Sequence, residues 1–378
     1  MTARRNGRHW GVSVSNSRNT AFGSLAWLVL AFAMSWSSAS VASARTIYVA
    51  PNGTDDATGT SVWPIRTINQ AVKVAVAGDK IIVRDGVYQE IVQVWKGGTK
   101  TRPLQIVAEH KGLAVIQGTG TPWDTDLVAI TADNVQFSGF TVRGSTRSGI
   151  SVWKASDVLV ADNTVTESQR AGIWVGAPGL GQSTRVRIIG NTVINNCLEN
   201  SDLSWTGGWP RAIAVDVSTV ATISKNVVAQ NYGEGIGLLS TQNAKINKNS
   251  VFDNFSVEIY LDNAPQSTVT QNIVFSTADT SFFRTGNPAY GILIANEATE
   301  FYMPSRKIRV TGNTLIGSGT ATYVGVDHQG SLIESTIRPN TARATMNRDA
   351  LIKSISRLVK IPVASLLPCS SVLLCPTK

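Results

Sequence analysis

The chain of 378 residues is 43% hydrophobic and only 16% charged, and it contains 32 glycines. This composition excludes an intrinsically disordered chain, which would carry fewer apolar residues and a denser charge. It also disfavours a helical membrane protein, because only one apolar run approaches the length of a bilayer span. The formal net charge of +9 raises the question of a polyanionic partner.

A basic and then apolar segment opens the chain. Four arginines precede an apolar run over residues 21–34, and small residues follow up to Ala44. That order is typical of a secretory signal peptide, so we predict cleavage of residues 1–44 and a secreted or periplasmic protein without a membrane segment. A short N-terminal membrane anchor is the alternative. Cleavage before Arg45 changes the charge balance to 30 − 25 = +5. This permits an acidic ligand, and the sequence has no clustered basic run of the kind that indicates nucleic acid.

The predicted N-terminal region covers residues 45–90. Residues 66–77 form an amphipathic pattern, with Thr67 as the expected N-cap and Gly78 as the expected end of a helix. We expect this helix to cover the first strand edges of the core that follows.

A motif of the form aliphatic-x-x-Asn-x-aliphatic recurs along the middle of the chain. Successive asparagines are 28, 35, 23, 23 and 41 residues apart, so 23 is the base period and the longer gaps contain inserts. Phe140 occupies the asparagine place one period earlier. The asparagines of this motif are Asn163, Asn191, Asn226, Asn249, Asn272 and Asn313. A second set, which we expect to form another polar stack, consists of Asn196, Asn231 and Asn254.

A second stripe of the form Ile-x-aliphatic lies half a period away, starting at Ile150, Ile173, Ile213, Ile236, Ile259 and Ile292. This alternation has the period of a strand, so each repeat carries at least two short strands joined by turns. Repeats of this length cannot bury their own apolar face and must stack. The sequence therefore predicts an all-β chain, a right-handed parallel β-helix, with coils over residues 91–330 in a single domain.

The last region, residues 331–378, contains a second amphipathic pattern over residues 347–360, which predicts a helix that covers the other end of the core. Cys369 and Cys375 are close enough in sequence to pair in an oxidising compartment, which leaves Cys197 as a buried small residue. No Cys or His cluster indicates a metal site.

The start of the predicted mature chain resembles the N-terminal region of secreted pectate-lyase-like β-helix proteins. The resemblance rests on the run from Ile47 to Asp55, on Gly78-Asp79 and on Asp85-Gly86-Val87-Tyr88, and with the coils it covers roughly residues 45–330. It implies the β-helix fold but not one chemistry, because this superfamily contains lyases, glycosidases, epimerases and binding proteins, with lyases on acidic polysaccharides favoured slightly by their frequency. The calcium-dependent lyases of this superfamily carry an Asp-Asp-Gly-x-Asp cluster, whereas the matching segment here, Gly233-Glu234-Gly235-Ile236-Gly237, keeps one carboxylate. The motifs of alginate epimerases and polygalacturonases are absent, so no family catalytic set transfers, and Ca²⁺ stays an open alternative.

Outward positions of the Ile-x-aliphatic strands predict a groove in which aromatic rings stack on sugars and charged groups act on them. Asp216 and Asp262 are two coils apart, roughly 9.6 Å at ~4.8 Å per strand, near the roughly 6.5–9.5 Å of an inverting glycosidase. Arg170 and Arg211 are candidate clamps for a substrate carboxylate. The candidate catalytic residues are Asp216, Asp262, Glu258, Glu234 and Arg211. The candidate substrate-binding residues are Trp153, Trp174, Tyr260, Arg170, Trp205 and Trp209.

Three functions stay open on the sequence. The first is a lyase on an acidic polysaccharide, the second is an inverting glycoside hydrolase that uses Asp216 and Asp262, and the third is a protein that binds exopolysaccharide without cleaving it. In each case we expect a monomer whose partner is a polysaccharide and not a nucleic acid.

Overall fold

The computed structural model describes residues 43–207, 209–297, 299–317, 323–327, 334–337 and 341–343. The fold described below belongs to the unit that begins at Ser43. The predicted helix over residues 347–360 and the pair Cys369 and Cys375 lie outside the described residues, as does most of the predicted signal peptide. Within the described residues, no helix is both long and apolar enough to cross a membrane.

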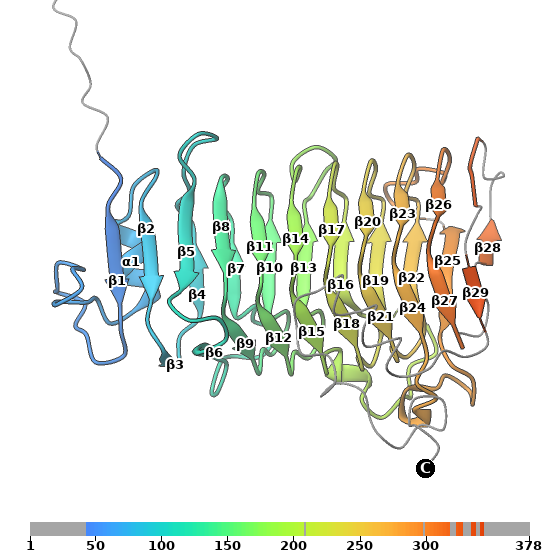
Figure 1. Cartoon of the computed structure of the whole chain (residues 1–378), viewed down its shortest axis with the longest axis horizontal. Helices are drawn as coiled ribbons and strands as arrows, with labels where there is room; N and C mark the ends of the chain where they lie inside the picture. The colour runs from blue at the N-terminus through green and yellow to red at the C-terminus, as the bar shows by residue number, and fades with distance from the viewer. Residues whose placement is uncertain are drawn as a thin grey trace, which may run out of the picture. The chain divides into compact units, whose positions relative to one another are not determined.

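Each coil of this unit contributes one strand to each of three parallel sheets, which we name sheets A, B and C (Figure 1). The prediction of at least two strands per repeat is therefore met by three. The asparagine motif accounts for the third strand, because it spans two strands and the bend between them: Val160 lies in sheet A and Val165 in sheet B. The stripe that starts at Ile150 forms sheet C.

Sheet A has ten described strands in the order in which the chain forms them. They are β1 Thr46–Val49, β2 Lys80–Val83, β5 Leu104–Ala108, β8 Val135–Ser138, β11 Leu159–Ala161, β14 Arg187–Ile189, β17 Thr222–Ser224, β20 Lys245–Asn247, β23 Thr268–Thr270 and β26 Arg309–Thr311.

Sheet B also has ten described strands. They are β3 Gly86–Tyr88, β6 Ala114–Gln117, β9 Thr141–Arg143, β12 Thr164–Thr166, β15 Thr192–Ile194, β18 Val227–Ala229, β21 Ser250–Phe252, β24 Ile273–Phe275, β27 Thr314–Ile316 and β29 Thr341–Arg343.

Sheet C has nine described strands. They are β4 Val92–Val94, β7 Val128–Ile130, β10 Ile150–Trp153, β13 Ile173–Gly176, β16 Arg211–Asp216, β19 Glu234–Leu239, β22 Val257–Asp262, β25 Tyr290–Asn296 and β28 Tyr323–Asp327.

The core is built from columns of aliphatic side chains that occupy the same register on successive coils. In sheet C, Ile173 pairs with Ile213, which pairs with Ile236, and then come Ile259 and Ile292. All five are fully buried. Burial of each such side chain is worth about 1.5–3 kcal/mol, so the in-register columns are a main source of stability.

The two predicted asparagine stacks are both present. At the bend between sheets A and B, Asn226 N–H and Nδ2 donate to Asn249 Oδ1 at 2.9 and 3.0 Å, and Asn249 donates in the same way to Asn272. Phe140 begins this ladder, because its N–H donates to Asn163 Oδ1 at 3.0 Å. At the bend between sheets B and C, Asn196 N–H and Nδ2 donate to Asn231 Oδ1, and Asn231 donates in the same way to Asn254 Oδ1. The ladders satisfy buried backbone and amide groups that would otherwise lose their hydrogen bonds to water.

The predicted N-terminal helix is present as α1 Ile68–Val74, with Thr67 Oγ1 accepting from Gln70 N–H as the N-cap. It packs on β1, β2 and β4 through Ile68, Ala71 and Val72. The expected end at Gly78 was wrong, since the helix ends four residues earlier. Ala75 has an extended backbone, and Val76 N–H donates to the buried Asp79 carboxylate instead of to a helical carbonyl, so the helix ends before these residues.

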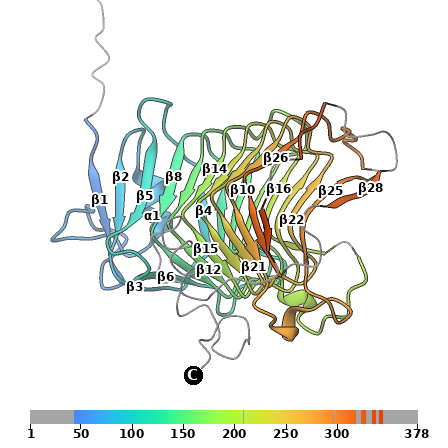
Figure 2. The ribbon, with the colours of Figure 1, turned by 45° about the vertical axis from the view of Figure 1, so that its right-hand side comes forward.

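Two of the predicted inserts border sheet C and contain short 3₁₀ helices, η1 Leu198–Asn200 and η2 Thr280–Phe282 (Figure 2). Cys197 begins the first insert and is fully buried, as predicted. Burial raises the pKa of its thiol, which agrees with a structural residue and not a nucleophile.

Candidate functional site

The outer face of sheet C carries two stacked tryptophans. Trp153 and Trp174 have ring centroids 5.3 Å apart and an interplanar angle of 16°. Gly176 follows Trp174 on β13, and a Cβ at this glycine would lie 2.5 Å from the indole Cζ2. The glycine therefore lets the Trp174 ring lie flat along its own strand, where Trp153 stacks on it and the Arg147 guanidinium carbon lies 6.0 Å from its centroid.

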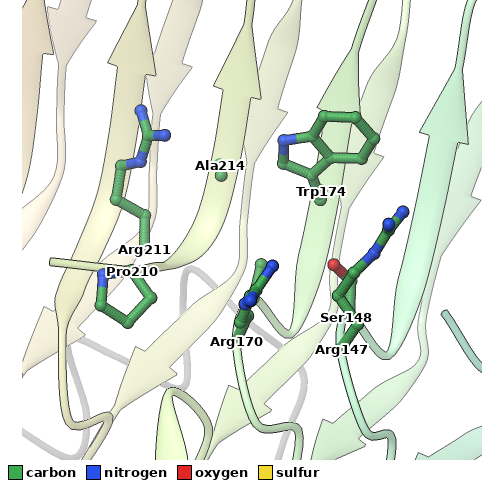
Figure 3. Close-up of a pocket in the computed structure, with 8 residues that line it drawn as sticks. Arg147, Ser148, Arg170, Trp174, Pro210, Arg211 and Ala214 are labelled. Carbon is green, nitrogen blue, oxygen red and sulfur yellow. The ribbon is translucent and has the colours of Figure 1, made fainter. Parts of the chain in front are cut away.

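Beside Trp174 lies a pocket of about 310 Å³ that three arginines line (Figure 3). Arg147, Arg170 and Arg211 come from three successive coils, just before β10, before β13 and at the start of β16. Pro210 and Trp174 complete the main part of the wall. The predicted clamps Arg170 and Arg211 are thus brought together with Arg147, which the sequence analysis did not select.

Each of the first two arginines is anchored by carboxylates behind the pocket. Arg147 Nε donates to Asp126 Oδ1 at 2.8 Å, and this bond raises the pKa of Arg147. Arg170 Nε donates to Glu199 Oε1 at 2.9 Å, and its Nη1 lies 3.1 Å from Asp124. These contacts fix the guanidinium planes, so little side-chain entropy remains to be lost when an anion binds.

Arg211 lies in a small cluster of acids on the outer face of sheet C. Its Nη1 is 2.9 Å from Asp216 Oδ1, and Trp174 Nε1 donates to Asp216 Oδ2 at 2.9 Å. Burial disfavours the charged form of Arg211, but the nearby charges of Asp216, Glu234 and Asp262 outweigh it and raise its pKa. The guanidinium is therefore held in its ionised form.

Gly237 makes room for Arg211. A Cβ at residue 237 would lie 2.1 Å from Arg211 Cδ and 3.1 Å from Glu234 Oε2. The side chains of Arg211 and Glu234 therefore lie over the backbone of β19, at the glycine that pairs with Tyr260. Glu234 is 6% exposed and its Oε2 has no hydrogen-bond partner, and burial raises its pKa to about 8.

The next strand supplies Tyr260 and Asp262. The Tyr260 hydroxyl donates to Glu297 Oε1 at 2.5 Å. Asp262 is buried and accepts from Glu297 N–H and Asn263 Nδ2, both at 2.8 Å, so it holds the turn after β25. Burial and the negative charge of Glu297 raise the pKa of Asp262, although the two hydrogen bonds act to lower it.

The register places Asp216 opposite Leu239 and Leu239 opposite Asp262. The two acids therefore lie on one face two strands apart, roughly 9.6 Å at ~4.8 Å per strand. Asp216 is ion-paired with Arg211, whereas Asp262 holds a turn.

Glu258 does not face the groove, which corrects the prediction of an outward side chain. It is 1% exposed and accepts from Asn254 N–H and Nδ2, so it ends the second asparagine ladder. Simple alternation fails at this position of β22 because it lies close to the bend at Asn254: a Cβ at the equivalent Gly235 of β19 would be 2.9 Å from Asn254 Nδ2.

Trp205 and Trp209 lie in the first insert and do not line the arginine pocket. Trp209 packs against Phe255 and lies under the Arg284 guanidinium, 4.0 Å from the ring centroid. Arg147 could have been found from the sequence, since it stands three residues before Ile150 just as Arg170 stands three before Ile173.

The acids of the groove do not fit a calcium ion. Calcium needs six to eight oxygen ligands converging on one point, but here a guanidinium occupies the space between Asp216, Glu234 and Asp262. Among the described residues, the carboxylate and histidine groups close enough to share an ion are Asp85, Glu109 and His110, which are exposed and belong to the bend between sheets A and B.

The fold and this face define a right-handed parallel β-helix with a charged groove on one sheet. A family model described as "Pel9A-like, right handed beta helix region" matches residues 47–254, and a model described as "Right handed beta helix region" matches residues 195–342. The chain belongs to the Pel9A-like right-handed β-helix family, which confirms the predicted fold and superfamily.

Two curated relatives and one solved structure show what the chain is similar to. It is 30% identical to "Uncharacterized protein YwoF" of Bacillus subtilis over 206 residues, which are 51% of this chain and 43% of the relative. It is 39% identical to "Pectate lyase PEL9" of Emericella nidulans over 95 residues, 24% and 23% of the two chains. The chain thus matches less than half the length of either relative. The crystal structure of pectate lyase Pel9A superposes with a TM-score of 0.55 at 15% identity, covering 77% of this chain and 80% of that one, and supports the fold alone.

Proposed function

We propose that this protein binds an acidic, uronate-containing polysaccharide along the groove of sheet C and cleaves it by β-elimination. The observation that carries the proposal is the pocket that Arg147, Arg170 and Arg211 line beside Trp174. Anchored guanidinium groups match carboxylates in geometry and charge, and an indole face matches a sugar ring. Similarity to a curated pectate lyase supports the same substrate class.

In β-elimination a base removes the proton on the carbon next to the carboxylate. The bond to the glycosidic oxygen on the adjacent carbon breaks, a carbon–carbon double bond forms, and the leaving oxygen takes a proton from solvent. Arginines on the carboxylate favour this reaction because they stabilise the negative charge that develops when the proton leaves. Arg211 serves as a clamp and not as the base, since three acids hold it ionised.

We assign proton acceptance to Glu297. Among the acids beyond Arg211, Glu234 and Asp262 are buried, whereas Glu297 is exposed and its carboxylate is oriented by the Tyr260 hydroxyl. A general base must reach the substrate before its pKa matters, and Glu297 is the one of these three carboxylates that is exposed. Glu297 follows β25, three strands beyond β16, or roughly 14 Å at ~4.8 Å per strand. In this proposal it therefore acts on a uronate unit bound beside the Arg211 side chain over Gly237 and Tyr260, while Arg147 and Arg170 hold a neighbouring unit.

The test is incubation with a panel of uronate and neutral polysaccharides, following unsaturated-uronate absorbance and reducing ends in parallel. We expect both signals on a polyuronate and a loss of at least about tenfold in Arg170→Ala and Glu297→Gln. Arg143→Ala is the matched control, since Arg143 contacts Gln117 on sheet B, away from the groove. Absence of both signals on every polyuronate contradicts the lyase.

An inverting hydrolase is the second candidate, favoured by the register that sets Asp216 and Asp262 two strands apart on one face. It predicts reducing ends without absorbance, and their loss in Asp216→Asn and Asp262→Asn. Binding without either signal would favour a non-catalytic exopolysaccharide-binding protein. All three functions place the protein outside the cytoplasm, which N-terminal sequencing of the exported protein can test.

A further inference from the structure

We propose that the outer face of sheet A is a second binding surface for an acidic polysaccharide, separate from the groove on sheet C. On five neighbouring strands, β14, β17, β20, β23 and β26, one register position holds a row of alternating cations and threonines. Arg187 pairs with Thr222, Thr222 with Lys245, Lys245 with Thr268, and Thr268 with Arg309. We call these five residues the sheet A row.

The cations of the row are regularly spaced and free to bind. They occur on every second strand, roughly 9.6 Å apart at ~4.8 Å per strand, and sheet A runs along the whole stack of coils in Figure 1. Arg187, Lys245 and Arg309 are exposed. None of the three takes part in an ion pair within the described part of the chain. A linear polyanion can therefore meet several of them at once without breaking an existing pair.

A polar pocket of about 360 Å³ lies at the β14 end of the row. Arg187 and Thr222 of the row line it, together with Lys100, Arg185 and Gln136. Asp157 also lines the pocket, and its carboxylate accepts from Arg185. That bond and, after it, the charges of Lys100 and Arg187 lower the pKa of Asp157, so the pocket holds three cations against one acid. The pocket gives the row a concave end in which a sugar unit can be held.

The chemistry of this face favours a polysaccharide over other polyanions. A second row beside the first consists of half-buried hydroxyl and amide side chains suited to sugar hydroxyls, namely Asn247, Thr270 and Thr311. The described strands β11 to β26 of sheet A contain no aromatic residue. Single-stranded nucleic acids are typically held by stacking of bases on aromatic rings, and peripheral membrane contacts use inserted aromatic or apolar side chains.

The test measures binding of polygalacturonate to the full chain at low salt. We expect the triple variant Arg187→Ala, Lys245→Ala, Arg309→Ala to bind about tenfold more weakly and with a shallower salt dependence, since three exposed ion pairs with the polymer are lost. The matched control removes three exposed cations elsewhere, Arg66→Ala, Lys73→Ala, Lys111→Ala, and is expected to bind like the wild type.

Groove binding is separated by a second variant, Arg147→Ala, Arg170→Ala, in which binding through the sheet A row is expected to persist. The proposal shares its ligand class with the proposed function but needs no catalysis, so a protein without lyase activity still tests it. Equal binding by the triple variant and the wild type overturns it, as does an equal loss in the control. Tighter binding to single-stranded DNA or to anionic lipid vesicles than to polygalacturonate also overturns it.

Discussion

A built-in cation distinguishes the groove at the scale of single residues. Arg211 is surrounded by Asp216, Glu234 and Asp262, and it can lie there because Gly237 has no side chain. The positive charge that the carboxylate of the proposed uronate substrate would need is thus part of the chain.

This arrangement predicts that polyuronate binding does not depend on divalent cations. We expect EDTA to leave the affinity for polygalacturonate within about twofold, because a guanidinium already neutralises the acids that a cation would bind. Calorimetric titration with EDTA or with added Ca²⁺ checks this. A tenfold gain on adding Ca²⁺ would show that a metal site forms with the substrate.

Gly237→Ala tests the position of Arg211. The new Cβ would lie 2.1 Å from Arg211 Cδ, so the guanidinium must move. We expect polyuronate affinity to fall about tenfold, or ~1.4 kcal/mol, with little change in thermal stability, because the arginine stem is flexible. Gly207→Ala is the control, since nothing lies within 4 Å of its added Cβ. Unchanged polyuronate affinity in Gly237→Ala would show that the position of Arg211 does not contribute to binding.

Glu234 predicts a pH dependence of stability. Its pKa is about 8 in the folded protein, against a model-compound value of 4.5, because burial disfavours its charge. Between these values the unfolded chain is deprotonated while the folded chain keeps the proton, so the free energy of unfolding falls as pH rises, by about 1.4 kcal/mol per pH unit at most.

Glu234→Gln removes that titration. We expect the variant to match the wild type near pH 4 and to be more stable by roughly 4 kcal/mol near pH 7.5, as measured by urea denaturation. Glu167→Gln, at an exposed site, serves as the control. The same stability difference at both pH values would show that Glu234 does not bind a proton on folding in this range.

At the scale of elements, the asparagine ladders join coil to coil. Asn249 accepts from Asn226 N–H and Nδ2 at 2.9 and 3.0 Å and donates to Ile223 O and Asn272 Oδ1, both at 3.0 Å. All these groups are buried, so water cannot replace a lost partner without opening the bend.

Asn249→Ala is therefore expected to lower the free energy of unfolding by about 2–4 kcal/mol, since it leaves several buried donors and acceptors unpaired. Chemical denaturation measures the change. Lys245→Ala, on the exposed face of the adjacent strand, is expected to change it by less than about 0.5 kcal/mol. A similarly small effect in Asn249→Ala would mean that the ladder forms in the folded protein but does not stabilise it.

The strands and the asparagine ladders could be predicted from the sequence because every coil must place the same kinds of residue at the same register. The buried aliphatic columns and both ladders recur at one register, so their period is visible. Side chains at bends and in inserts follow no such period. Glu258 lies near the start of β22, where its side chain turns back to Asn254 of the same coil. Glu297 follows an irregular strand end and bonds to Asp262 of the preceding coil. Both positions depend on contacts that the repeat does not show.

At the scale of the whole molecule, stacking creates surfaces that no local run of sequence encodes. Arg187, Lys245 and Arg309 are 58 and 64 residues apart in the chain but share one register on sheet A. A search for basic clusters along the sequence misses them for that reason. The same stacking brings three arginines from successive coils to one pocket on sheet C.

Two anion-binding faces on one β-helix predict that affinity depends on polymer length. A short oligouronate occupies one face, whereas different segments of a long chain reach both, and the second contact then forms at a high effective concentration. We expect the affinity gain from short oligomers to long polygalacturonate, compared per uronate unit, to be at least about tenfold in the wild type. The gain should be largely lost in the triple variant of the sheet A row, while the short oligomer keeps its wild-type affinity for the groove. Calorimetry over a series of defined lengths measures this. An equal gain in the wild type and the triple variant would mean that long chains bind the groove alone.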